Sequence, residues 1–309
     1  MIREVNNREM STKTKVIKKP YSETKPKKIP LSLMRSLVEI YYDFQKQRII
    51  TSNRIFGNVR CNDITDKELE YHGVKDLLHD AETFETRIKS LLTKQLPNFP
   101  IYKEYLSKIA GIGPIISAGL IAYVDDVAKF ENISKLWQLS GYGMNRFCPN
   151  CKTPTFVTVE YENREKKKTK AKKLKPFELC PVCDKATVPM IQRRVIGYQS
   201  NWNDKMKVLC WKIGGSFVKQ PAAKSGYRKI YDLVKADEVS KHPTKEVRNG
   251  KTFFNKGHLD NRAKRKVVKT FLSHLWTRWR EMEGLPVTEA YAGKLLGHSM
   301  VSPFVDKED

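Results

Sequence analysis

The sequence is poor in acidic residues, and this shortage is its most informative feature. Its 309 residues include 34 aspartates and glutamates against 58 lysines and arginines, which leaves a formal net charge of +24. An enzyme that acts on small neutral metabolites does not need such an excess of positive charge, whereas a protein that binds a polyanion does. The composition therefore predicts a nucleic acid as the partner.

The sequence also lacks the features of membrane, secreted and fibrous proteins. The longest uncharged apolar stretch, residues 109–124, is interrupted by three glycines and a proline, and it is too short to cross a bilayer. The first residues form no signal-peptide apolar region. Glycines and prolines number only 16 and 15, which argues against a fibrous repeat or global disorder. We therefore expect a cytoplasmic, nucleoid-associated protein without membrane segments.

The N-terminal third of the sequence divides into a basic tail and a helical arm. Residues 11–30 hold seven lysines, one glutamate and three helix-breaking prolines, so residues 1–30 are expected to be a disordered tail. Over residues 31–97, apolar side chains recur at spacings of three and four, which predicts a helical, coiled-coil-like arm. This seam comprises Leu33, Leu37, Ile40, Phe44, Val74, Leu77, Ala81, Phe84, Ile88 and Leu91. The sequence leaves open whether it pairs within the chain or in a homodimer.

A helix-hairpin-helix is predicted within residues 98–147, after a domain boundary at residues 96–100. Residues 109–114 read Ile-Ala-Gly-Ile-Gly-Pro, so one helix should end at Gly111 and the next begin at Pro114. The backbone N–H groups of Gly111, Ile112 and Gly113 would then form a phosphate cradle, with Lys108 supplying charge. The alternative is an ordinary helical hairpin in which the glycines only permit close packing.

Four cysteines predict a structural zinc site. Cys148 and Cys151 form one Cys-Pro-x-Cys pair, and Cys180 and Cys183 form a second pair after 28 intervening residues. Two such pairs supply the four thiolates of a closed tetrahedral site, which leaves no position for a catalytic water. A redox role is the alternative. The other two cysteines, Cys61 and Cys210, are expected to be buried or incidental.

The zinc ribbon is expected to span residues 148–190 as an insertion with a cationic tip. Residues 156–161 alternate like a strand, and residues 164–175 contain eight basic residues and one glutamate. We therefore expect Lys166, Lys167 and Lys168 to contact phosphates, the alternative being a merely soluble loop.

Two amphipathic helices are predicted in the remaining segment, residues 191–309. The first covers residues 201–219, with Ser200 as its N-cap. The second covers residues 260–283, with an apolar face on the core and a basic face without intervening acids. The basic residues predicted to lie along DNA are Arg262, Lys264, Arg265, Lys266 and Lys269, next to Arg278 and Arg280. The alternative is a generic solvated helix.

The expected fold class is mainly α: a helical arm and a hairpin-containing helical domain with an inserted four-cysteine zinc ribbon.

Several segments resemble the C-terminal transposase domain of the Piv/MooV-like insertion-sequence transposases (the "IS-one-ten" group). They are residues 109–114, 118–122 (Ala-Gly-Leu-Ile-Ala), Asp125, Asp126, Phe130, 136–142 (Leu-Trp-Gln-Leu-Ser-Gly-Tyr), 200–207, 227–234 and 263–266. The arm is similar to the coiled coil that precedes this domain in the family. The resemblance covers most of residues 31–285 and implies a role in DNA transposition or recombination.

This sequence contains poor matches to the catalytic residues of the family. Its N-terminal RuvC-like domain, whose carboxylates bind divalent metal, has no counterpart in this sequence, so a RuvC-like partner protein would have to supply them. At the place of the family's nucleophilic serine this chain has Gly143-Met144-Asn145, which leaves Ser140 and Ser200 as weak candidates. We therefore expect a transposase-like DNA-binding protein. An active serine transposase and an RNA-binding zinc-ribbon protein are the alternatives.

Overall fold

The computed structural model describes residues 29–62, 64–151, 179–180, 182–192, 194, 200–248, 251–288 and 301–307. Most of the basic tail lies outside these residues, as do the expected strand at 156–161 and the cationic tip with Lys166, Lys167 and Lys168. The described chain is mainly helical, which confirms the expected fold class. Its strands form two short antiparallel pairs, β1 (Met144–Phe147) with β2 (Val188–Ile191) and β3 (Glu246–Arg248) with β4 (Lys251–Phe253).

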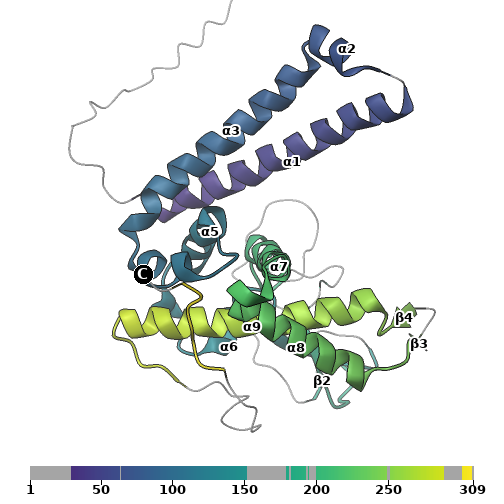
Figure 1. Ribbon diagram of the computed structural model, residues 1–309. Coiled ribbons are helices and arrows are strands. Elements are labelled where there is room, and N and C mark those ends of the chain that lie inside the picture. The colour runs from purple at the N-terminus through teal and green to yellow at the C-terminus, as the bar shows by residue number, and fades with distance from the viewer. Residues whose placement is uncertain are drawn as a thin grey trace, which may run out of the picture.

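The arm is an antiparallel helical hairpin within one chain. Helices α1 (Leu31–Cys61) and α3 (Val74–Gln95) lie side by side, and the short α2 (Asp66–Tyr71) caps their far end (Figure 1). The predicted seam is offset: Met34, Val38 and Tyr41 are buried on α1, whereas Leu33 is 50% exposed. Glu85 of α3 causes part of this difference, because it accepts hydrogen bonds from Tyr41 and Arg48 at 2.8 and 2.7 Å. The α1–α3 interface thus combines this polar group with apolar contacts of the predicted seam, among them the buried Ile88 and the Phe44–Phe84 ring pair at 5.1 Å.

The boundary expected at residues 96–100 does not separate two cores. Leu96 and Phe99 are buried, and they belong to the same apolar cluster as Met34 and Val38 of the arm. Helix α5 (Pro114–Val124) packs against α1 and α3 at the base of the arm (Figure 1). The arm is therefore continuous with the helical body at its base and projects only at its tip.

The body is built around α5 and the long helix α9 (Lys256–Met282). Helices α6 (Ile133–Leu139), α7 (Asp204–Val218) and α8 (Gly226–Lys241) pack against α9, which runs across the lower part of Figure 1. The short α4 (Pro100–Glu104) and the 3₁₀ turns η1 (Leu96–Asn98), η2 (Leu106–Lys108), η3 (Val127–Lys129) and η4 (Ala222–Lys224) complete the described helices. The apolar face predicted for the last helix is buried through Ala263, Val267, Phe271 and Leu275.

The starts of both C-terminal helices differ from the prediction. Helix α7 begins at Asp204 because Asn203, not Ser200, is its N-cap and accepts a hydrogen bond from the Met206 N–H at 3.0 Å. Helix α9 begins at Lys256, four residues before the expected start, because Asn255 caps it. Asparagine ranks with serine as an N-cap, so Asn203 serves this role as well as Ser200 would have done.

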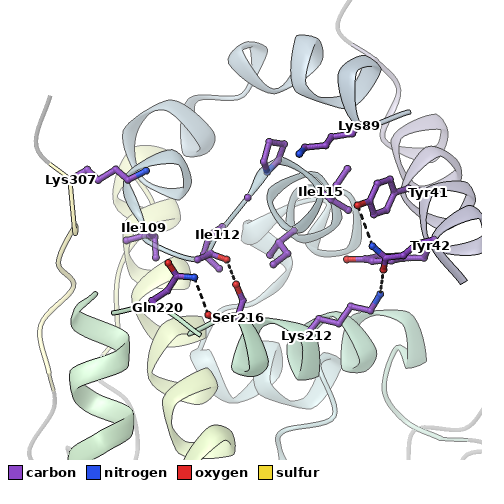
Figure 2. A pocket seen from close by; sticks show the side chains of 15 residues that line it. Tyr41, Tyr42, Lys89, Ile109, Ile112, Ile115, Lys212, Ser216, Gln220 and Lys307 are labelled. Atoms are coloured by element: carbon purple, nitrogen blue, oxygen red, sulfur yellow. Dashed lines mark hydrogen bonds between the residues drawn. The ribbon is translucent and has the colours of Figure 1, made fainter. Parts of the chain in front are cut away.

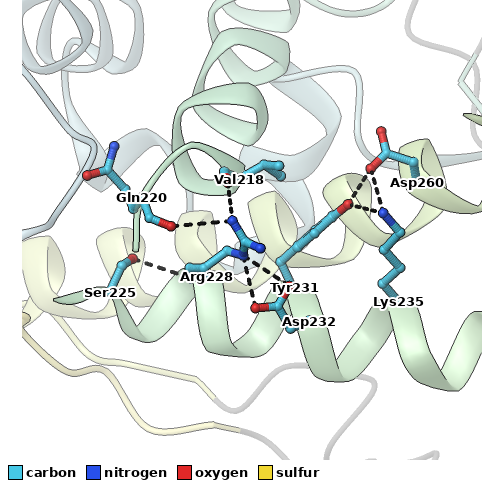
Figure 3. A network of polar contacts seen from close by, with 8 residues as sticks. All are labelled: Val218, Gln220, Ser225, Arg228, Tyr231, Asp232, Lys235 and Asp260. Carbon is cyan, nitrogen blue, oxygen red and sulfur yellow. Dashed lines mark hydrogen bonds and ion pairs between the residues drawn. The ribbon is translucent and has the colours of Figure 1, made fainter. Parts of the chain in front are cut away.

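Polar contacts fix α8 between its neighbours. Arg228 donates to the carbonyls of Val218, the last residue of α7, and of Gln220 just beyond it, and it pairs with Asp232 at 2.9 Å (Figure 3). One turn further on, Tyr231 is hydrogen-bonded to Asp260 of α9 (Figure 3). These contacts hold α8 against the end of α7 and against α9.

Candidate metal centre and nucleic-acid interface

The four cysteines predicted as metal ligands converge at one place. Their Sγ atoms all lie within 4.8 Å of one another, and the distances Cys148–Cys183, Cys151–Cys180 and Cys151–Cys183 are 3.5, 3.4 and 3.7 Å. Four thiolates around a tetrahedral zinc lie about 3.8 Å apart, given a Zn–S bond of about 2.3 Å. The arrangement therefore fits a single tetrahedral metal ion, and all four thiols are free of disulfides.

Local backbone geometry builds the second cysteine pair. The Cys180 N–H donates to the Lys185 carbonyl, and the Asp184 N–H donates to the Cys180 carbonyl, both at 2.9 Å. Asp184 adopts a positive φ of 51°, which closes this turn, and the Val182 N–H points at the Cys180 sulfur at 3.5 Å. Burial raises the pKa of the Cys180 thiol to about 11, so its thiolate needs a nearby cation. A metal ion held by the four cysteines would provide that cation.

The ribbon is anchored to the helical body by a cluster of amides. It begins at β1, four residues before the expected start at Cys148, and β1 pairs with β2 from Met144↔Ile191 to Phe147↔Val188. The Gln192 side chain accepts from the Gly143 N–H at 2.8 Å and donates to Asn201 at 3.0 Å. Asn201 also bonds Asn145 of β1. The base of the ribbon, where β1 and β2 meet, is therefore tied to the segment before α7.

At the hairpin, the two glycines have different roles. Gly111 has a φ of +91°, and a Cβ there would lie 3.2 Å from both Ser216 and Gln220 of the α7 end. Its carbonyl accepts a hydrogen bond from the Ser216 hydroxyl at 2.6 Å. Gly113 has an ordinary φ of −86°, and a Cβ there would meet nothing within 4 Å. The segment before the turn is the 3₁₀ turn η2, which ends at Lys108 and not at Gly111 as expected. The buried Tyr105, which precedes η2, is hydrogen-bonded to Tyr227 of α8 at 2.8 Å.

A cleft of about 550 Å³ opens beside this turn, at the N-terminus of α5 (Figure 2). Gly113 is the N-cap of α5 and supplies no side-chain hydrogen bond, so the first N–H groups of this helix lack a side-chain cap. The side chains that line the cleft include three lysines, Lys89 of α3, Lys212 of α7 and Lys307, and no carboxylate. Positive charge from three distant segments thus gathers at the positive end of a helix dipole.

Lys212 is the most constrained of these cations. It is half-buried, its Nζ lies 3.2 Å from the centre of the Tyr42 ring, and it reaches Gln45 Oε1 at 3.5 Å (Figure 2). Burial lowers its pKa to about 8. Within the described part of the chain it forms no ion pair with a carboxylate. The sequence does not predict this site, although Lys212 stands out there as a lone charge in the apolar centre of α7.

Lys108, predicted to serve the same cradle, lies elsewhere. It lines a separate hollow with Glu104, Arg278 and Glu281. Its carbonyl accepts the backbone N–H groups of Asp306 and Lys307, each at 3.1 Å. The Asp306 carboxylate also accepts the N–H groups of Ala110 and Gly226, at 2.9 and 2.6 Å. This C-terminal segment thereby brings Lys307 to the cleft.

The basic face of α9 is engaged within the protein. Arg262 and Lys266 pair with Glu238 of α8, and Lys264 pairs with Asp260 at 2.6 Å. Arg265 donates to the Tyr142 and Gly143 carbonyls, and Lys269 lies 3.9 Å from the Trp137 ring centre. Arg280 is buried and donates to the carbonyls of Pro286 and Phe130. No acid lies between these residues in the sequence. In the structure, Glu238 of α8 and Asp260, one turn earlier on α9, supply acidic partners.

Among the described residues, neither candidate nucleophile has the partners of a catalytic serine. Ser140 is buried, and its hydroxyl donates to the Trp137 carbonyl at 3.0 Å. Ser200 lies half-buried before α7. In the part of the chain that the structure describes, no hydrogen bond joins either serine to a histidine or a carboxylate.

No family model matches this sequence, and a search of curated proteins finds no relative. Among the described helices, none combines the length and the apolar character needed to cross a membrane.

Proposed function

We propose that this protein binds duplex DNA and that the cleft beside the Gly-Ile-Gly turn holds a backbone phosphate. One observation carries the proposal: Lys212, a half-buried cation without a carboxylate partner among the described residues, lines the same cleft as the α5 N-terminus. A phosphate there would receive the helix N–H groups and neutralise the ammonium group at the same time. Lys89 and Lys307 would add charge at the rim.

Phosphate contacts of this kind give affinity without reading the base sequence. The role in DNA transposition or recombination implied by the resemblance belongs to the same proposal, with strand cleavage depending on carboxylates from a RuvC-like partner. We further propose that zinc is the metal held by Cys148, Cys151, Cys180 and Cys183. Four thiolates close the coordination sphere, so the metal would stabilise the ribbon and take no part in catalysis.

Gly113→Asp tests the phosphate site and should leave the fold intact. Aspartate is a good N-cap, and a Cβ at this position meets no neighbour, so α5 should be stabilised. The new carboxylate would occupy the place of the phosphate, and we expect the affinity for duplex DNA to fall at least tenfold. Fluorescence anisotropy with a labelled duplex, measured over a range of salt concentrations, gives both affinity and salt slope.

Asn132→Asp is the matched control. Asn132 is the exposed N-cap of α6 and lies outside the cleft, so this variant makes the same change in charge at another helix start. We expect it to change the affinity less than twofold. Equal losses in the two variants would show that only net charge matters, and a flat salt response of the wild type would refute electrostatic binding altogether.

A further inference from the structure

Another hollow, of about 340 Å³, lies between α7 and α9 and shares no lining residue with the hairpin cleft. Its lining includes Lys207, Trp211 and Gly214 of α7 with Asn261, Lys264 and Arg265 of α9. The lining contains two aromatic rings, an amide and three cations. Lys264 pairs with Asp260, whereas no ion pair with a carboxylate joins Lys207 or Arg265 among the described residues.

Trp211 is unusually exposed for its type. The buried face of α7 contains Met206, Leu209, Ile213 and Phe217, whereas the Trp211 side chain is 66% exposed at the hollow. A large aromatic ring that is exposed to water is stabilised when another flat ring stacks on it. Gly214, one turn further along, lets α9 approach α7 closely, because a Cβ there would come within 3.2 Å of Val268.

The cations of the hollow repel one another. Arg265 is held by the carbonyls of Tyr142 and Gly143 and lies over the Tyr142 ring at 4.9 Å, without a carboxylate partner among the described residues. Lys207 contacts the Trp202 ring at 4.1 Å and donates to the Gln192 carbonyl at 3.4 Å. Burial, and next the charge of Arg265, lower the pKa of Lys207. An anion placed between these two cations would relieve that repulsion.

We propose that this hollow binds an unpaired nucleotide of a single strand, with the base stacked on Trp211 and its phosphate held by Lys207 and Arg265. The ring recognises any base, because every base offers a π face. Bases in an intact duplex are already stacked on their neighbours, so the site selects strands that are open, gapped or overhanging. The inference rests on the proposed function and extends it from duplex to single-stranded nucleic acid.

Trp211→Ala should separate the two sites. We expect this variant to bind a short oligothymidylate about tenfold more weakly, the usual size of one lost stacking contact, while its affinity for a blunt duplex is unchanged. Trp211→Phe should recover most of the loss, since phenylalanine keeps a ring. Leu233→Ala is the control, because Leu233 is an equally exposed apolar residue (72%) on α8 outside the hollow. An oligouridylate arm of the same experiment distinguishes DNA from RNA as the source of the strand.

The outcomes identify which proposal fails. If the wild type binds duplex DNA but Trp211→Ala changes the affinity for neither ligand, or for both equally, the nucleotide site is refuted and duplex binding stands. If the wild type binds no nucleic acid, the proposed function fails and this inference fails with it. Weakening of single-strand binding alone, rescued by phenylalanine, supports both.

Discussion

Glu238→Gln is the substitution that separates the structural and DNA-binding roles of the basic face of α9. The Glu238 side chain is only 1% exposed, and its carboxylate pairs with Arg262 and, at 2.6 Å, with Lys266. Burial alone would raise the pKa of Glu238. The hydrogen bonds and charges of the two cations outweigh burial and bring the pKa down to about 2. The carboxylate thus stabilises the contact between α8 and α9 only while it is ionised.

The size of this contribution follows from the pKa change. A drop from 4.5 to about 2 corresponds to roughly 3 kcal/mol of folding free energy at neutral pH. Arg262 and Lys266 are 40% and 48% exposed, so solvent screening reduces the expected loss in Glu238→Gln to about 2 kcal/mol. Because the folded pKa is the lower one, the contribution is complete above about pH 4.5 and is lost as the pH falls toward 2.

Urea unfolding followed by circular dichroism measures this difference. We expect wild type and Glu238→Gln to differ by about 2 kcal/mol near pH 7 and by less than half of that near pH 3. Comparison of the two proteins at each pH cancels the titration of the cysteine cluster, which both share. A difference that is absent at pH 7, or that stays constant down to pH 3, would refute the ion-pair account.

The same variant tests the DNA-binding residues predicted on α9. Removal of the Glu238 charge releases Arg262 and Lys266 from their partner and adds one unit of positive charge. If these side chains reach phosphates, the affinity for duplex DNA should rise about two- to threefold at low salt. An unchanged or lower affinity would assign them to the packing of α8 on α9 alone.

Three further outcomes are expected. Metal analysis should give about one zinc per chain, and Cys148→Ser or a chelator should lower the melting temperature; an unchanged melting temperature would contradict a structural role. Gly111→Ala should cost about 1–3 kcal/mol of stability in urea unfolding because of its positive φ, whereas Gly113→Ala should cost far less, and equal costs would contradict their different roles. Duplex affinity should be constant below about pH 8 and fall above it as Lys212 loses its proton; the same decline in Lys212→Met would exclude this residue as the cause.

The sequence by itself determined the helical character of the chain and which four cysteines come together as candidate metal ligands. Helical periodicity and capping residues are local, and two Cys-x-x-Cys pairs have few other uses, so the convergence of Cys148, Cys151, Cys180 and Cys183 followed from spacing alone. The turn at Gly111 and the helix start at Pro114 were likewise predictable from backbone preferences.

The tertiary structure decided everything that depends on contacts between distant segments. Packing of the arm against itself and α5 selected the buried register of α1, which the apolar spacing had placed one residue away. Glu238 reaches Arg262 and Lys266 only because α8 lies on α9, which turned an apparently free basic face into ion pairs. The cleft likewise unites lysines 89, 212 and 307 from three segments. Charge acts through distance in space, and sequence alone does not fix which charges meet.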